Sequence, residues 1–213
     1  KMKDIFPLIF VTTSRFPSLN LLKFTKEIRY IFPNSKFLNR GSFFIKRLIT
    51  TCLYNQGTDL IMIHEHRGNP DAFVISHLPK GPSAFFCIKK FLFSFDIKKK
   101  GFFHQSPNLI VDNLESPLGK RLSNILCSLF CPPQRNSKRI ITFSGKENHI
   151  LVRHHLFQKN QINNKNINLI EIGPSLDLYP YKITLGVLGE NSPLIEWNLP
   201  IFTKKSKKKF FLT

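Results

Sequence analysis

The sequence is poor in acidic residues, and this shortage sets the charge of the whole chain. Of 213 residues only 13 are Asp or Glu, against 32 Lys or Arg, so the formal net charge is +19. No cluster of carboxylates is present that would hold the metal ions of a nuclease. So positive a chain is surrounded by a field that favours a polyanion as its partner.

Long apolar runs are also missing. A helix needs about 18 or more consecutive apolar residues to cross a bilayer, and the sequence contains no such run. The first residues, KMKDIFPLIFVTTSR, have a basic start but no small-residue cleavage pattern. We therefore expect no membrane partner, and we predict that this stretch forms the first strand.

Cysteine is scarce and scattered. Cys52, Cys87, Cys127 and Cys131 form no CxxC pair, so the sequence gives no zinc motif. Reduced, buried thiols are typical of a cytosolic or nuclear protein. The motifs HExxH, GxxxxGK[ST] and GxSxG are missing as well, and we expect no cofactor and no small-molecule substrate.

The first part of the chain alternates strand and helix patterns. Ser18 is a good N-cap for a row of apolar residues at helical spacing, and Pro33 ends that row. The pattern predicts strands at 5–13, 36–40 and 59–66 with helices at 18–32 and 42–55, which indicates a partly parallel sheet. Hairpin-like strands are expected next, at 72–78, 84–93 and 108–113.

A second cycle begins at Ser116. Residues 117–130 carry apolar side chains on one face and polar ones on the other, and Pro132 closes this predicted helix. Strands are expected at 138–145, 149–157, 166–173, 176–188 and 194–199. Because IITFS resembles the earlier IFVTTS, we predict two related α/β halves, at about 5–101 and 108–202, followed by a basic tail at 203–213.

The stretch HEHRGNPDAFVISHLPKGPSAFF, residues 64–86, combines histidines and acids. On a strand His64 and His66 share one face and Glu65 points to the other. A metal-dependent RNA-processing enzyme would use these residues with His77 from the neighbouring strand. The spacing matches no metal motif, so structural hydrogen bonding is the favoured interpretation.

Several segments together carry a family resemblance that spans nearly the whole chain in order. They are TTSRFPS (12–18), FPNSKFLNRG (32–41), TDLIMIHEHRGNPD (58–71), ISHLPKGPSAFF (75–86), LGKRLSNIL (118–126), RIITFSGKENHILVRHH (139–155), EIGPSLDL (171–178) and IEWNL (195–199). This set resembles the Brix-domain family of ribosome-biogenesis proteins. Phe16 departs from the family pattern, which usually has Asp there.

The resemblance implies a Brix domain over residues 1–205, with mixed α/β sheets and two halves similar to anticodon-binding domains. It implies a non-enzymatic RNA-binding factor of the small-subunit processome, located in the nucleus and nucleolus. The implied partners are U3 small nucleolar RNA, pre-rRNA, and Mpp-ten and Imp-three type proteins. A Brix-type factor for the large ribosomal subunit is the related alternative.

Basic residues beside predicted loops are the candidate RNA contacts. Some follow strand ends or begin the second-half helix, where the helix dipole favours phosphate. The resemblance adds the RIITF to RHH region as an RNA-binding motif, and the lysine-rich tail is a nuclear address, an RNA contact or both. The candidates are Arg15, Arg40, Arg67, Lys120, Arg121, Lys138, Arg139, Arg153, His154, His155, Lys204, Lys205, Lys207, Lys208 and Lys209.

Overall fold

The first half of the chain alternates strands and helices. The structure is a computed structural model that describes residues 6–97, 105–133, 137–159 and 167–199. The elements here are β1 (Ile9–Thr13), α1 (Leu19–Ile31), β2 (Ser35–Phe37), α2 (Ile45–Tyr54), β3 (Asp59–His66), β4 (Asn69–His77) and β5 (Ser83–Leu92). As predicted, Ser18 caps α1, because its hydroxyl accepts a hydrogen bond from the Leu21 N–H at 3.1 Å.

The second half begins with a similar strand and capped helix. Its elements are the short 3-10 helix η1 (Ser94–Asp96), β6 (Asn108–Asp112), α3 (Pro117–Cys127), β7 (Arg139–Lys146), β8 (His149–Lys159), β9 (Ile167–Glu171), β10 (Ser175–Thr184) and β11 (Ile195–Asn198). The Ser116 hydroxyl accepts from the Gly119 N–H at 2.9 Å at the start of α3. The expected strand at 176–188 is shorter, because β10 ends at Thr184.

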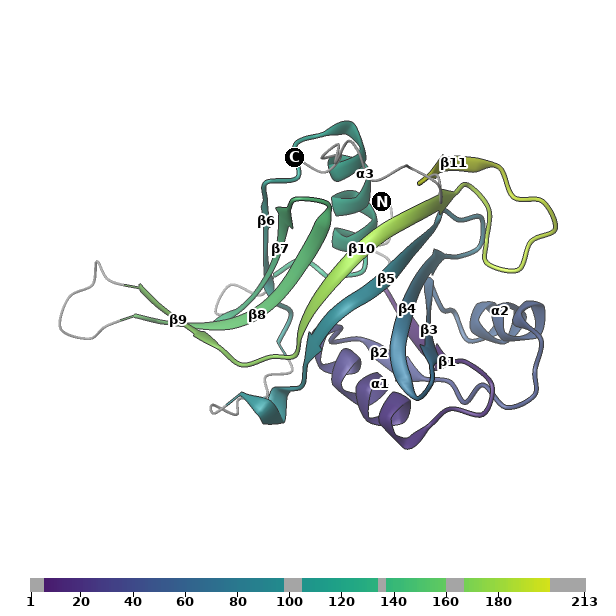
Figure 1. The fold of residues 1–213 in the computed structure, drawn as a ribbon, viewed down its shortest axis with the longest axis horizontal. Coiled ribbons are helices and arrows are strands. Elements are labelled where there is room, and N and C mark those ends of the chain that lie inside the picture. The colour runs from purple at the N-terminus through teal and green to yellow at the C-terminus, as the bar shows by residue number, and fades with distance from the viewer. Residues whose placement is uncertain (1–5, 98–104, 134–136, 160–166, 200–213) are drawn as a thin grey trace.

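All these strands belong to one mixed sheet of 11 strands (Figure 1). Its path is β2-β1-β3-β4-β5-β10-β8-β7-β6, with β9 beside β8 and β11 beside β10. In the first half β1 runs parallel to β3, and β3, β4 and β5 are antiparallel in turn. The second half repeats this order, since β6 runs parallel to β7 and β7, β8 and β10 are antiparallel in turn.

The two halves meet where β5 and β10 pair in antiparallel register. Ser83 lies opposite Thr184 at one end of this pair, and Leu92 lies opposite Ser175 at the other. IITFS lies in β7, which takes the place of β3, whereas IFVTTS lies in and after β1. The likeness between these two segments therefore does not mark equivalent strands, because β6 takes the place of β1.

Helices cover the two faces of the sheet unequally. Leu21 and Ile28 of α1 and Leu122 and Ile125 of α3 belong to a single buried core cluster, so both helices pack on one face. On the other face α2 covers only the region around Phe10. In Figure 1 none of the described helices lies in front of β5, β10 and β8. None of the described helices is long and apolar enough to cross a membrane.

Candidate nucleic-acid interface

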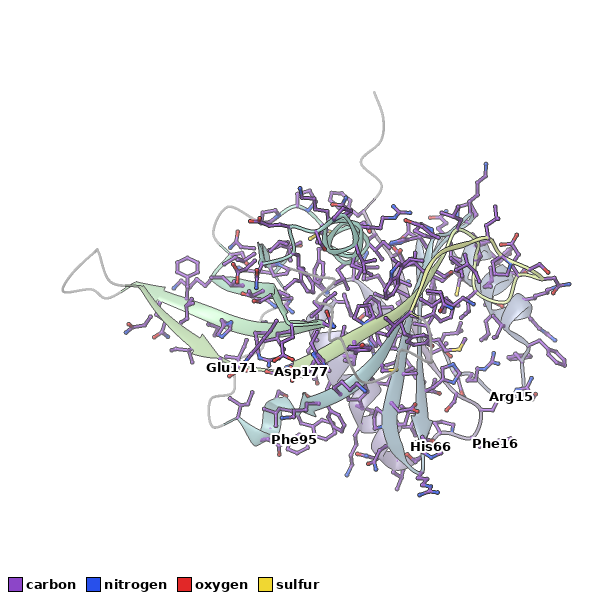
Figure 2. The ribbon with its side chains drawn as sticks, turned by 45° about the horizontal axis from the view of Figure 1, so that its top comes forward. Arg15, Phe16, His66, Phe95, Glu171 and Asp177 are labelled. Atoms are coloured by element: carbon purple, nitrogen blue, oxygen red, sulfur yellow. The ribbon has the colours of Figure 1, made fainter. Side chains whose placement is uncertain are left out.

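The exposed candidates lie at separate places on the molecule. Arg15 and Arg67 follow β1 and β3, whose parallel pairing puts both residues at the same end of the sheet. Figure 2 shows Arg15 and His66 at this end. Lys120 lies in the first turn of α3, which begins at Pro117, and Lys138 precedes β7. The structure therefore brings together the first two of these candidates but not the last two.

Arg139 and His154 lie inside the fold, which corrects the expectation that their side chains are available to RNA. Arg139 is 2% exposed and His154 is 4% exposed. The Arg139 guanidinium donates to His154 Nε2 at 2.8 Å, to the Gln105 carbonyl at 3.2 Å, and to the carbonyls of Tyr30 and Ile31. The last two carbonyls end α1, where the helix dipole favours a cation. Arg139 therefore fastens β7 to α1.

Burial sets the protonation state of this pair. Burial is the main cause that lowers the pKa of His154 to about 3, and the positive charge of Arg139 contributes in the same direction. His154 is therefore neutral at pH 7, so that its Nδ1–H donates to the Gly173 carbonyl at 2.6 Å and its Nε2 accepts from Arg139. Burial also lowers the pKa of Arg139 to about 10, which leaves the guanidinium charged at pH 7.

Two further candidates are engaged in ion pairs. Arg121 of α3 holds Glu196 of β11 through two hydrogen bonds, of 2.7 and 3.0 Å. This contact raises the pKa of Arg121. Arg153 of β8 binds Asp177 of β10 at 2.7 Å. Both arginines connect neighbouring elements of the second half, and a carboxylate already offsets part of the charge of each.

The remaining candidates differ in their surroundings. Arg40 is only 6% exposed, although it follows β2 in a loop. His155 is half-buried, and its Nδ1 has no hydrogen-bond partner among the described residues. The lysines of the tail, at positions 204, 205 and 207–209, lie outside the described residues.

Side chains of β3 and β4, the two strands of the HEHRG hairpin, form hydrogen bonds to other elements of the fold. The Glu65 carboxylate accepts hydrogen bonds from both the backbone N–H, at 2.9 Å, and the hydroxyl of Ser18 at the start of α1. The His77 ring contacts Asp59 through Nδ1 and Ser128 through Nε2, the latter at 3.2 Å. Within the described ranges no group of three or more His, Cys, Asp or Glu residues could hold a metal ion.

A concave basic surface lies on the face of the sheet that α1 and α3 leave open. Two adjoining hollows, of ≈ 530 and ≈ 270 Å³, share Lys89 and Lys90 of β5, Arg153 of β8 and Asp177 of β10. The smaller hollow extends to the turn between β7 and β8. We call this surface the basic groove, and its charged and histidine lining is Lys89, Lys90, Lys146, Glu147, His149, Arg153 and Asp177.

Unpaired lysines give the basic groove its charge. Asp177 is engaged by Arg153, whereas Lys89, Lys90 and Lys146 form no ion pair among the described residues. The Lys89 ammonium lies 5.3 Å from the centre of the Tyr179 ring. The centroids of the His149 and Tyr179 rings are 5.2 Å apart. Cations beside an aromatic ring on an open sheet suit an RNA strand, which offers phosphates and base faces together.

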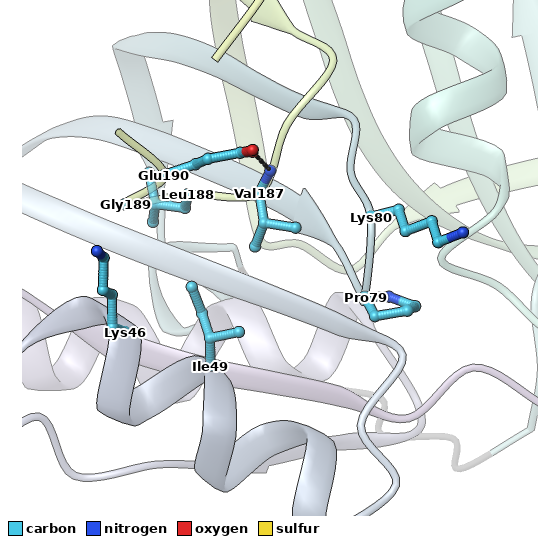
Figure 3. A pocket seen from close by; sticks show the side chains of 8 residues that line it. All are labelled: Lys46, Ile49, Pro79, Lys80, Val187, Leu188, Gly189 and Glu190. Carbon is cyan, nitrogen blue, oxygen red and sulfur yellow. Dashed lines mark hydrogen bonds between the residues drawn. The ribbon is translucent and has the colours of Figure 1, made fainter. Parts of the chain in front are cut away.

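A third hollow, of ≈ 400 Å³, lies between α2 and the loop that follows β10. Figure 3 shows Lys46 and Ile49 rising from α2 toward that loop. The Glu190 carboxylate is held there by the Val187 N–H at 3.2 Å. The charged lining of this hollow is Lys46, Lys80 and Glu190, so it carries a smaller net positive charge than the basic groove and is a poorer match for a polyanion.

Sequence reasoning missed most of the basic groove. Lys89 and Lys90 stand within the apolar run AFFCIKKFLF, which predicts a strand but not its neighbours. Only the pairing of β5 with β10 and of β10 with β8 brings these lysines to Arg153. The lysine pair itself indicates such a surface, because charged side chains on a central strand require a sheet face that is exposed to solvent.

Comparison with known proteins places this geometry in a family. The Brix domain matches residues 14–182. The chain is 39% identical over 209 residues to a U3 small nucleolar ribonucleoprotein protein, IMP4, of Bos taurus, covering 97% of this chain and 71% of that protein. It is 43% identical over 209 residues to a Brix domain-containing protein of Caenorhabditis elegans, with the same coverage.

A solved structure shares the fold. A probable ribosomal biogenesis protein from Aeropyrum pernix K1 has a TM-score of 0.59 at 18% sequence identity, and the match covers 86% of this chain and 98% of that one. The resemblance found in the sequence segments is thus confirmed by the match over residues 14–182 and by the identity to curated relatives. The chain belongs to the Brix-domain family.

Proposed function

We propose that this chain is a non-enzymatic RNA-binding factor that acts in early ribosome assembly within the U3 small nucleolar ribonucleoprotein. The basic groove carries the proposal, because it collects unpaired lysines and an aromatic ring on an open sheet. The net charge of +19 adds a long-range attraction to RNA. Relatives named as U3 small nucleolar ribonucleoprotein proteins favour the small subunit over the large.

We also propose partners and a cellular location for this function. The RNA partners are U3 small nucleolar RNA and pre-rRNA, and the protein partners are of the Mpp-ten and Imp-three types. The work is done in the nucleolus. Crosslinking in cells, with sequencing of the bound RNA and identification of co-purified proteins, tests all three. Recovery of large-subunit precursors in place of U3 RNA would overturn the assignment to the small subunit.

Direct binding tests the groove. We expect the chain to bind single-stranded segments of U3 RNA and of 5′ pre-rRNA, with an affinity that falls steeply as salt rises. Replacing Lys89, Lys90 and Lys146 together by Gln removes three charges from the groove. Fluorescence anisotropy against salt concentration should then show a slope smaller by about 0.7 for each lost phosphate contact.

A matched control separates the groove from net charge. Lys23, Lys26 and Lys36 are exposed in the first half, away from the groove. Their joint replacement by Gln changes the net charge by the same amount, and we expect it to reduce binding far less. Equal losses from the two triple variants would mean that RNA binding is spread over the surface, and the groove would lose its role.

A further inference from the structure

Polar groups without partners gather at the carboxyl end of β1. Arg40 is 6% exposed, and its Nη1 is buried without a hydrogen bond among the described residues. The hydroxyls of Thr12 and Ser14 are buried and unpaired in the same way. A buried polar group without a partner is costly, so a concentration of such groups indicates a ligand.

These groups point to one face of the sheet. Phe10 and Leu38 pack together against α2, and side chains two positions later along an extended chain return to the same face. Thr12 and Ser14 continue from Phe10 in this way, and buried Arg40 continues from Leu38 after exposed Asn39. The backbone of the two segments is held together by the Leu38 N–H, which donates to the Val11 carbonyl at 2.9 Å.

More cations surround the same place. The Arg15 guanidinium carbon lies 5.2 Å from the centre of the Phe44 ring, and that of Arg47 lies 4.4 Å from the Phe43 ring. None of Arg15, Arg40 and Arg47 forms an ion pair among the described residues. Burial lowers the pKa of Arg40, and the charge of Arg15 lowers it further.

The start of α2 adds to this positive potential. Phe44 is the N-cap residue of α2, so no side chain caps the helix, and its first turn contains no acidic residue. The free N–H groups and the helix dipole at this end favour an anion. Arg15 stacks on Phe44 itself, which places its guanidinium at the entrance of the helix.

Aromatic rings extend the site outward. Phe16 is 92% exposed and Phe44 is 75% exposed. The backbone of Phe16 has a φ of 52°, in the left-handed region that bulky residues avoid. Figure 2 shows Phe16 beside Arg15 at the rim of the molecule. Exposed rings beside arginines can stack with unpaired bases.

We propose that the carboxyl end of β1 binds a backbone phosphate of single-stranded RNA through Arg40, Arg15 and the Thr12 hydroxyl, with bases stacked on Phe16 and Phe44. Arginine suits this role because its planar fork matches phosphate oxygens and also lies flat on aromatic rings. This inference rests on the proposed function. It adds a second contact point in the first half, separate from the basic groove of β5, β10 and β8.

Variants at Arg15 and Thr12 test the site without loss of the fold. Arg15 is exposed, and its replacement by Met should weaken binding of a short single-stranded RNA about tenfold, as expected for a lost charged hydrogen bond. Thr12→Val removes a hydroxyl that has no partner in the free protein, so binding should weaken while thermal stability does not fall. Lys26→Met, an exposed change on α1, is the control.

Inorganic phosphate is a second probe. We expect phosphate to raise the melting temperature of the wild-type chain more than chloride at equal ionic strength, and Arg15→Met and Thr12→Val to remove this difference. Phosphate stabilisation lost in these variants together with unchanged RNA affinity would assign the site to a free anion and overturn the RNA proposal. Tighter competition by an acidic peptide than by RNA would overturn it in favour of a protein partner.

The two proposals fail in different ways. If the wild-type chain binds RNA and the groove variant weakens it, but Arg15→Met and Thr12→Val bind as the wild type does, this site is wrong and the proposed function stands. If the wild-type chain binds no RNA, both are wrong.

Discussion

The guanidinium of Arg139 donates a hydrogen bond of 3.0 Å to the carbonyl oxygen of Ile31, which lies 108 positions earlier in the sequence. Ile31 is the last residue of α1, and Arg139 is the first residue of β7. The contact therefore joins the first half of the chain to the second, away from the central pairing of β5 with β10. A side chain that sequence patterns assign to RNA thus holds two parts of the fold together.

Arg139→Met should destabilise the protein by about 3 kcal/mol. The change keeps much of the apolar volume but leaves the carbonyls of Tyr30, Ile31 and Gln105 without this donor, and a buried polar group left unpaired costs about 1–3 kcal/mol. Urea unfolding monitored by circular dichroism measures the loss. Exposed Lys138, the preceding residue, gives the control variant Lys138→Met. Equal stability of the two variants would contradict the fastening role of Arg139.

His154 should make the protein less stable in acid. Burial lowers the folded-state pKa from 6.5 to about 3, so as pH falls the unfolded chain binds this proton before the folded one does. The free energy of unfolding should therefore fall between pH 6.5 and about 3, by at most about 1.4 kcal/mol per pH unit from this group.

The comparison with His154→Asn isolates this contribution. The variant has no titrating ring, so its stability should depend less on pH over the same interval, even if its stability at pH 7 is lower. His66→Asn, at an exposed position in the hairpin, should keep the wild-type dependence. A wild-type slope retained in His154→Asn would mean that other groups cause the loss in acid.

Strong local patterns explain why most elements were predictable. Ser18 and Ser116 stand directly before apolar rows at helical spacing, and both cap helices in the structure. The strand 59–66 was predicted with the bounds that β3 has. These features depend on neighbouring residues alone, and the chemistry of a cap or an alternating strand acts over a few positions.

Burial of charged residues was not predictable in the same way. Arg139 begins a strand after Lys138, and nothing in that segment distinguishes the exposed cation from the buried one, because the partners of Arg139 come from α1. The repeat that best marks the two halves was also overlooked. Gly-Pro-Ser occurs at 81–83 and at 173–175. The serine of each copy is the first residue of one of the two strands that join the halves, β5 and β10.

Glu65→Gln should destabilise the start of α1 by about 1 kcal/mol. The carboxylate accepts from both the backbone N–H and the hydroxyl of Ser18, next to the positive end of the helix dipole, and a neutral amide accepts more weakly. Hydrogen exchange of the amides in the first turn of α1 should rise in the variant. Glu115→Gln, at an exposed position before α3, should leave them unchanged. A catalytic role for Glu65 would instead require loss of an activity with the fold intact.

A comparison of Gly81→Ala with Gly68→Ala separates the cost of a strained backbone conformation from the cost of steric overlap. Both glycines have positive φ, +91° for Gly81 and +78° for Gly68, so each alanine meets the cost of the left-handed region, about 1 kcal/mol. An added Cβ at Gly81 would lie 2.4 Å from the carbonyl oxygen of Leu185, whereas nothing lies within 4 Å at Gly68. The Leu185 carbonyl belongs to the backbone just after β10, so it moves only if the junction of the two halves moves.

Gly81→Ala should therefore lose clearly more stability than Gly68→Ala, by about 2 kcal/mol or more, because overpacking against rigid neighbours typically costs about 1–3 kcal/mol beyond the backbone term. Thermal and urea unfolding of the two variants measure the difference. Equal losses would mean that the segment after β10 shifts to accommodate the added Cβ. The close approach of Gly81 to Leu185 would then not determine the register in which β5 and β10 pair.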